Sequence, residues 1–216
     1  MTTQHNTTQH NTTQHNTTQH NTTQHNTTQH KDSILDKFLR LYRLSTVKPF
    51  IKRYDKCKLL DIGCGFEAKF LRSIENYIDY GVGIDFKPPE IHTPKLKTVK
   101  SVLEKDLPFE DKSFDIVTML AVLEHITFEI EILKEVKRVL KDNGILILTV
   151  PSHTAKPVLE FLAFKLKIID RLEIEDHKRY YNKNDILNSA KLSGFTLEKH
   201  RYFQFGFNNF AILRKN

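Results

Sequence analysis

The chain has no tryptophan and only two cysteines, two methionines and seven glycines among its 216 residues. Two cysteines, Cys57 and Cys64, are too few for a disulfide framework and do not match the ligand spacing of a zinc site. No apolar run approaches the roughly twenty residues that span a bilayer, and no segment resembles a signal peptide. The sequence therefore predicts a cytoplasmic protein without structural disulfides.

The first thirty residues are a repeat rather than ordinary globular sequence. Residues 2–30 read TTQHN five times and then TTQH, without one substitution. The repeat contains no apolar residue after Met1, so it cannot bury enough surface to offset the entropy cost of ordering. We therefore expect residues 1–30 to be a disordered tail and residues 31–216 to form one domain with a single core.

The strictness of the repeat suggests copied DNA. The codons CAA-CAC-AAC-ACA-ACA encode Gln-His-Asn-Thr-Thr and are the five-base unit CAACA written three times. Because five is not a multiple of three, the loss of one unit would shift the reading frame. One hypothesis is therefore slippage-driven on/off expression, which is typical of genes that alter bacterial surface structures. A fifteen-base repeat, or a flexible tail without a regulatory role, is the alternative.

The formal net charge of +7 lies entirely in residues 31–216, because the repeat contains only histidine and neutral polar residues. A basic domain attracts anionic partners such as nucleotides, phosphoglycans or inner-leaflet lipids. The lysines are dispersed along the sequence rather than clustered, which favours a solvated lysine-rich surface instead.

Apolar periodicity from residue 31 onward predicts alternating helices and strands, with a first helix beginning near Asp32 or Ser33. The predicted strands are 58–62, 81–84, 97–103, 114–120, 145–150, 195–204 and 207–213. The predicted helices are 67–75, 127–140 (ended by Asn143-Gly144), 156–172 and 183–193. Continuous apolar strands between helices indicate an α/β fold, a Rossmann-like parallel sheet with helices on both faces. The last two strands are expected to close one edge as an antiparallel hairpin.

A glycine turn follows the first predicted strand, in LLDIGCG at residues 59–65. Such a turn before a helix forms a cradle at the carboxyl edge of a parallel sheet, where the backbone closely approaches a ligand. Asp85 ends the next strand twenty residues after Gly65, and an acid there can accept both hydroxyls of a ribose. The pattern therefore predicts a site for an adenosine-bearing cofactor.

LLDIGCG resembles the first motif of class I S-adenosylmethionine-dependent methyltransferases, and GVGIDF at residues 81–86 resembles their second. LPFEDKSFDIVTMLAVLEHI and then EVKRVLKDNGILILTVPS are similar to the branch that includes ubiquinone-type and glycan methyltransferases. The similarity covers roughly residues 58–152, with the motifs in the family's order and spacing. It implies S-adenosylmethionine as the cofactor.

The resemblance also implies which residues hold that cofactor. Asp61 and the backbone of Gly63 and Gly65 would bind the methionine end. Asp85 would bind the ribose, Phe86 would lie against the adenine, and Leu120 would form part of the pocket floor.

The chain departs from the family pattern in two places. The family usually has an acid that contacts the adenine amino group shortly before LPF; this chain has Ser101 or Val102 there, and Glu104 is the substitute. Some relatives bind a divalent metal through E-x-x-E-H. Here Ala121 replaces the first acid of that motif, so no metal is predicted.

The acceptor is expected to be a small molecule or a surface carbohydrate, methylated at oxygen. His125, which follows the fourth strand, is the first candidate for the base that takes the hydroxyl proton, and His177 is the second. A structural role for His125, packing or capping the turn, is the alternative. Residues 152–182 are an apolar, lysine-containing insertion on the acceptor side, interpreted as a lid. The alternatives are a peripheral membrane contact, a dimer contact or ordinary packing against the sheet. The sequence predicts no particular oligomer.

Other functions fit the sequence less well. A nicotinamide-binding domain would share the G-x-G-x-x-A pattern of residues 63–68, but not Asp61 or the LPFEDKSFD block. A DNA-amino methyltransferase would carry [DN]-P-P-[YFW] where this chain has MLAV, at residues 119–122. An RNA methyltransferase would need a basic groove rich in aromatic residues, which is not evident. A non-catalytic module that only binds the cofactor is a further alternative.

Overall fold

The structure, a computed structural model, describes residues 34–54, 56–103, 106–160 and 177–215. These residues belong to one compact unit, Asp32–Asn216. The repeat with its predicted disorder, Glu104, and the part of the insertion from 161 to 176 lie outside the described residues.

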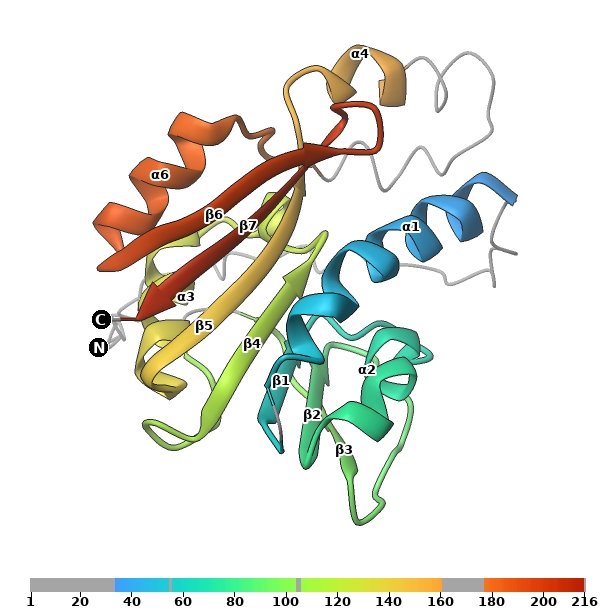
Figure 1. Cartoon of the computed structure of the whole chain (residues 1–216), viewed down its shortest axis with the longest axis vertical. Coiled ribbons are helices and arrows are strands. Elements are labelled where there is room, and N and C mark those ends of the chain that lie inside the picture. The colour runs from blue at the N-terminus through green and yellow to red at the C-terminus, as the bar shows by residue number, and fades with distance from the viewer. Residues whose placement is uncertain (1–33, 55, 104–105, 161–176, 216) are drawn as a thin grey trace, which may run out of the picture. The chain divides into compact units, whose positions relative to one another are not determined.

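The described strands form one seven-stranded sheet in the order β3-β2-β1-β4-β5-β7-β6 (Figure 1). Strands β1 to β5 pair in parallel, whereas β7 runs antiparallel to both of its neighbours, β5 and β6. This confirms the predicted Rossmann-like sheet with an antiparallel hairpin at one edge. The strands are β1 (Lys58–Ile62), β2 (Tyr80–Asp85), β3 (Leu96–Lys100), β4 (Phe114–Leu120), β5 (Leu140–Pro151), β6 (Phe195–Phe203) and β7 (Asn208–Lys215).

Helices cover both faces of the sheet because consecutive strand residues point to opposite sides. Leu60 packs into a core cluster that contains residues of α3 (Glu129–Val139) and α6 (Lys183–Leu192). Leu59, its neighbour in β1, packs into a second cluster that contains residues of α1 (Ile34–Ile51) and α2 (Lys69–Ile74) (Figure 1). Three short elements complete the described residues: η1 (Glu75–Tyr77), η2 (Leu123–His125) and α4 (Ala155–Glu160).

The predicted connection between α3 and β5 was wrong. The helix ends at Val139, and β5 begins at once with Leu140 instead of after an Asn143-Gly144 turn. The pair Asn143-Gly144 lies within β5, where the pairing with β4 shifts register and Asn143 adopts a left-handed φ of 62°. The two residues therefore form an irregularity within a strand. Asn and Gly adopt the left-handed φ that such an irregularity needs, just as they do at the end of a helix.

Several other boundaries moved by a few residues. The helix expected at 127–140 begins at Glu129, and residues 123–125 form the separate turn η2. Strand β3 ends at Lys100 rather than at residue 103. By contrast, β1 and β4 have the predicted limits, and Gly194 with φ 78° follows the end of α6 as expected.

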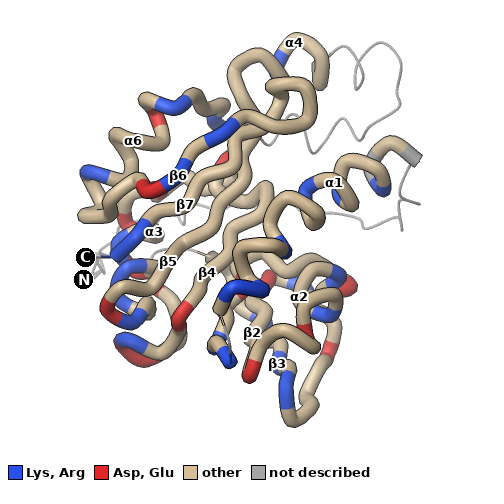
Figure 2. The backbone as a smooth tube through the Cα atoms, viewed as in Figure 1, with Lys and Arg blue, Asp and Glu red and all other residues tan. Residues whose placement is uncertain are grey.

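Basic and acidic residues are scattered along the described elements (Figure 2). This distribution agrees with a solvated, mixed surface. No helix among the described residues has the length and apolar character needed to cross a bilayer. The cytoplasmic location stays a prediction.

Arg138 in α3 fixes the loop that precedes β4. Its guanidinium donates hydrogen bonds to the carbonyl oxygens of Leu107 and Phe109, at 3.0 and 2.8 Å, and pairs with the carboxylates of Asp111 and Glu135. Because hydrogen bonds from a charged group are stronger than neutral ones, we expect Arg138→Met to lower the free energy of unfolding by about 2 kcal/mol. Urea denaturation measures this change.

Lys134→Met is the matched control, since Lys134 lies exposed on the same helix. We expect its unfolding free energy to stay within about 0.5 kcal/mol of the wild type. Equal losses in the two variants would contradict the role assigned to Arg138.

Candidate functional site

The glycine turn after β1 lies directly against the next strand and the β4–η2 connection. The Gly63 amide donates to the carbonyl oxygen of Ile84 at 2.8 Å, and Gly63 and Gly65 both have left-handed φ values, 73° and 71°. A Cβ atom on Gly63 would lie 2.3 Å from a methyl carbon of Val122. This position therefore requires glycine for two reasons, its φ and the close approach of Val122.

Asp85 lies beside the glycine turn, as the spacing predicts. One carboxylate oxygen accepts a hydrogen bond from the Gly65 amide at 2.9 Å, and the other accepts one from the Lys87 amide at 3.1 Å. The side chain is buried. A carboxylate has about four acceptor positions, so two remain for the hydroxyls of a ligand.

Asp61 lies in β1, two residues before Gly63, and its carboxyl group is buried. The Thr118 hydroxyl of β4 donates to it at 2.7 Å. The pKa of Asp61 is raised to about 7, mainly by burial and in addition by the charge of nearby Asp85, while the hydrogen bond from Thr118 opposes the shift. A cationic ligand group would stabilise the ionised form.

Two exposed phenylalanines flank the turn. Phe66 and Phe86 are 52% and 54% exposed, and their rings make an edge-to-face contact with centroids 5.7 Å apart. The sequence pointed to Phe86 but not to Phe66, although Phe66 directly follows the GCG turn. Exposed aromatic rings at the rim of a pocket can bind a planar base.

Two predicted cofactor residues remain, Leu120 and Glu104. Leu120 ends β4 and is half-buried, packed against the α1–α2 side of the core. It lies at the carboxyl end of the sheet, and its place in the pocket floor stays a prediction. Glu104 lies outside the described residues.

Cys64 is buried within the turn. Burial, together with the charges of Asp61 and Asp85, raises the pKa of its thiol to about 12, so it is not a nucleophile near neutral pH.

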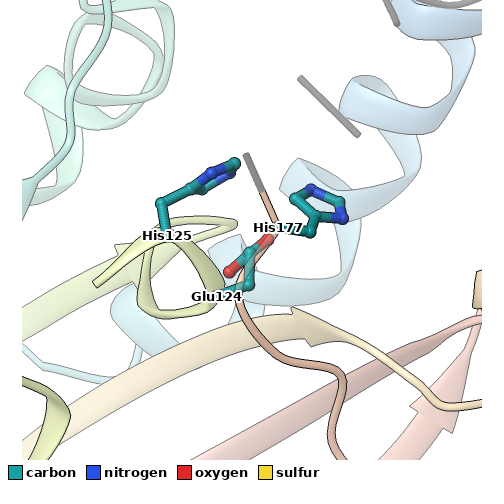
Figure 3. A group of neighbouring side chains, drawn as sticks. All are labelled: Glu124, His125 and His177. Atoms are coloured by element: carbon teal, nitrogen blue, oxygen red, sulfur yellow. The ribbon is translucent and has the colours of Figure 1, made fainter. Parts of the chain in front are cut away.

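The two candidate histidines, far apart in sequence, lie together near the end of β4. The rings of His125 and His177 are in edge-to-face contact, with centroids 4.8 Å apart. Glu124, which is 1% exposed, joins them, and one ligand atom from each of the three side chains lies within 4.8 Å of the others (Figure 3). The sequence indicated the two histidines separately; neither their contact nor the burial of Glu124 was apparent from it.

Backbone contacts fix the segment that carries His177. The Lys178 amide donates to the carbonyl oxygen of Glu124 at 2.9 Å. The buried Tyr181 donates its hydroxyl to the carbonyl oxygen of Leu123 at 3.4 Å. Burial, with the nearby carboxylates of Glu129 and Glu124, raises the pKa of Tyr181 above its ordinary value, so it stays a neutral donor. The chain after the insertion is thus joined to η2.

Comparison with known families agrees with this geometry. A family profile described as "Methyltransferase domain" matches residues 60–148, from β1 through most of β5. The matched range includes the glycine turn, Asp85 and the Glu124–His125 pair, but not His177.

Individual relatives extend the similarity beyond that range. An uncharacterized protein of Methanocaldococcus jannaschii is 30% identical over 181 residues, 74% of this chain and 69% of the relative. The ubiquinone biosynthesis O-methyltransferase of Pelagibacter ubique is 25% identical over 74% of this chain and 72% of its own length. Among solved structures, an S-adenosylmethionine-dependent methyltransferase of Aquifex aeolicus superposes with a TM-score of 0.60 at 14% identity, covering 82% of this chain and 92% of that one. With its fold, glycine turn and matched domain, the chain belongs to the class I S-adenosylmethionine-dependent methyltransferases.

Proposed function

We propose that this enzyme transfers the methyl group of S-adenosylmethionine to an oxygen atom of a small molecule or a surface glycan. The contact between Gly65 and Asp85 carries the proposal, because it joins the glycine turn to the acid that is proposed to bind the ribose. Val122, which lies against Gly63, links this turn to η2 within the chain. The name of the Pelagibacter ubique relative, an O-methyltransferase, supports oxygen as the accepting atom.

The cofactor is proposed to follow the rim of the sheet. Asp61 and the backbone of Gly63 and Gly65 hold its methionine end. The ribose binds Asp85, and the adenine lies against Phe86 and against Phe66, whose ring contacts that of Phe86. Leu120 contributes to the floor, and Glu104 is proposed to contact the adenine amino group.

The reaction needs alignment and the removal of one proton. The acceptor oxygen uses a lone pair to form a bond to the methyl carbon while the carbon–sulfur bond breaks, and the sulfur keeps that electron pair. The hydroxyl proton leaves to a base, and His125 and His177 are the proposed candidates because both rings are half-buried beside the end of β4. Closure of residues 152–182 over the acceptor is proposed to exclude water.

Replacing the ribose-binding acid tests the cofactor site. We expect Asp85→Asn to lower the affinity for S-adenosylmethionine about tenfold, because an amide accepts hydrogen bonds less strongly than a carboxylate and loses one acceptor oxygen. Isothermal titration calorimetry measures the affinity. Asp79→Asn, at an exposed position just before β2, serves as the control and should bind like the wild type.

A wild-type protein that binds no S-adenosylmethionine would refute the proposal at its first step. Binding without any methylated product would favour the non-catalytic module. Mass spectrometry of surface glycans and small metabolites, with the gene on and off, identifies the acceptor. Methylated RNA in place of both would make the enzyme a nucleic-acid methyltransferase.

Variable expression of this gene is proposed from the repeat alone. The DNA sequence tests it: an uninterrupted CAACA unit supports frame shifting, whereas synonymous codons that break the five-base period contradict it.

A further inference from the structure

We infer that Glu124, His125 and His177 form a binding site for a divalent transition-metal cation, most simply Zn²⁺. Two imidazoles and one carboxylate are a donor set that such cations prefer, and it leaves coordination positions open for water or an acceptor oxygen. Among the described residues, this is the only group of at least three histidine, cysteine or acidic side chains with its ligand atoms gathered in this way. The inference rests on the proposed function for its role in catalysis, but not for metal binding itself.

The local sequence supplies only two of the three ligands. Glu124 and His125 are adjacent in η2, and Ala121, the first residue after β4, offers no ligand atom. This absence led to the prediction of no metal. The third ligand comes from fifty-two positions later in the chain, His177, which the fold brings onto η2 (Figure 3).

The distances require only a small adjustment. Ligand atoms lie about 2.0–2.2 Å from a bound zinc ion, so two ligands of one ion are roughly 3–4 Å apart. The three ligand atoms here lie within 4.8 Å of one another. A movement of the half-buried imidazole nitrogens by about 1 Å would bring the ligand atoms to that spacing. The Lys178–Glu124 backbone hydrogen bond joins the two segments that carry them.

Tyr180 contacts one of the three proposed ligands. The Nδ1 atom of His177 lies 3.3 Å from the hydroxyl oxygen of Tyr180. Metal-bound histidines commonly place their other nitrogen against such a partner, which fixes the ring and its tautomer. With that contact kept, the cation would bind Nε2 of His177. Tyr180 lies three residues from His177, so the ligand and its partner come from one segment.

The candidate metal site follows the residue that contacts the proposed cofactor cradle. Val122, two residues before Glu124, contacts the Gly63 turn that cradles the cofactor. A cation here would lower the pKa of a coordinated acceptor hydroxyl, so its proton could pass to solvent and neither imidazole would need to be the base. The metal site and an imidazole base are therefore distinct outcomes of one experiment.

Cobalt(II) titration tests the inference, with the visible absorption of the bound ion as the readout. The chain has eleven histidines, six of them in the repeat at every fifth position from His5 to His30. All proteins should therefore carry those six as glutamine, which removes weak binding in the repeat. We expect one equivalent of Co²⁺ to bind and Zn²⁺ to displace it.

His177→Ala and Glu124→Gln should each weaken cobalt binding at least about a hundredfold, since losing even a supporting partner costs ten- to a hundredfold. His92→Ala, at an exposed histidine outside the cluster, should bind like the parent. His177→Gln replaces His177→Ala if the alanine variant does not fold. An absent cobalt band, or unchanged affinity in the His177 variant, would overturn the inference.

Calorimetry with S-adenosylmethionine on the same proteins, without metal, separates the two proposals. Cofactor binding without cobalt binding refutes the metal site alone. Cobalt binding without cofactor binding refutes the proposed methyl transfer and leaves the metal site standing.

Discussion

Replacing Gly63 with alanine is expected to abolish measurable binding of S-adenosylmethionine, with a loss of at least about a hundredfold, and to destabilise the protein by about 3 kcal/mol. The left-handed φ of 73° costs a non-glycine residue about 1–2 kcal/mol. The added Cβ would also lie 2.3 Å from a methyl carbon of Val122, a β-branched side chain with little freedom to move. Relief requires the turn or Val122 to shift, and either movement deforms the cofactor cradle.

Gly206→Ala is the matched control for this prediction. Gly206 also has a left-handed φ, 90°, but a Cβ there meets no atom within 4 Å. It follows β6, away from the glycine turn in sequence. We expect it to lose about 1–2 kcal/mol of stability and to keep cofactor affinity. Urea denaturation and calorimetry on both variants give the comparison; similar affinities in the two would remove the close approach of Val122 as the reason for glycine at position 63.

Asp61→Asn is expected to stabilise the cofactor-free protein at pH 8 while weakening cofactor binding at least about a hundredfold. The folded-state pKa of Asp61, about 7, lies above the ordinary value of 3.8. The folded state therefore holds a proton that the unfolded state has lost between pH 4 and 7. The free energy of unfolding falls as pH rises through that window, by up to about 4 kcal/mol in all.

Asparagine removes the charge and keeps an oxygen for the Thr118 hydroxyl. At pH 8 we expect a gain of about 2 kcal/mol, or about 4–8 °C in melting temperature for a domain of this size. At pH 5, where Asp61 is largely protonated, the two proteins should differ little. Thermal unfolding at both pH values tests the prediction, and a difference that does not depend on pH would contradict it.

Cofactor binding should also reveal the ionisation of Asp61, as a released proton. If the ammonium of the methionine end binds Asp61, the carboxyl group must ionise, so binding at pH 6 releases a proton. Calorimetry in two buffers with different ionisation enthalpies detects that proton. If the wild type releases this proton and Asp61→Asn does not, the proton comes from Asp61.

Asp61 illustrates why the cofactor site is a place of opposed demands. Its buried carboxyl group is unfavourable for the stability of the empty protein, whereas the empty fold itself requires glycine at position 63. Asparagine at position 61 would improve the empty fold. The acid at position 61 is therefore explained by the ligand rather than by the core.

The sequence by itself determined the architecture and the cofactor edge. Apolar runs with strand and helix periodicity gave the limits of β1 and β4, and the hairpin of β6 and β7 followed from two apolar segments after Gly194. The glycine turn and Asp85 were predictable because parallel strands end at one edge, so residues twenty positions apart necessarily meet there. Local propensity did not distinguish a helix end from a strand irregularity at Asn143-Gly144.

Only the tertiary structure decided what surrounds that edge. The approach of Val122 to Gly63, the burial of Glu124 and the contact of His125 with His177 all join segments that local periodicity cannot relate. His177 reaches η2 because the chain after the insertion is held there by the Lys178 and Tyr181 hydrogen bonds. Short-range sequence patterns encode which way a side chain points within one element. Which distant element it meets depends on packing over the whole sheet, and the candidate metal site arises at that level.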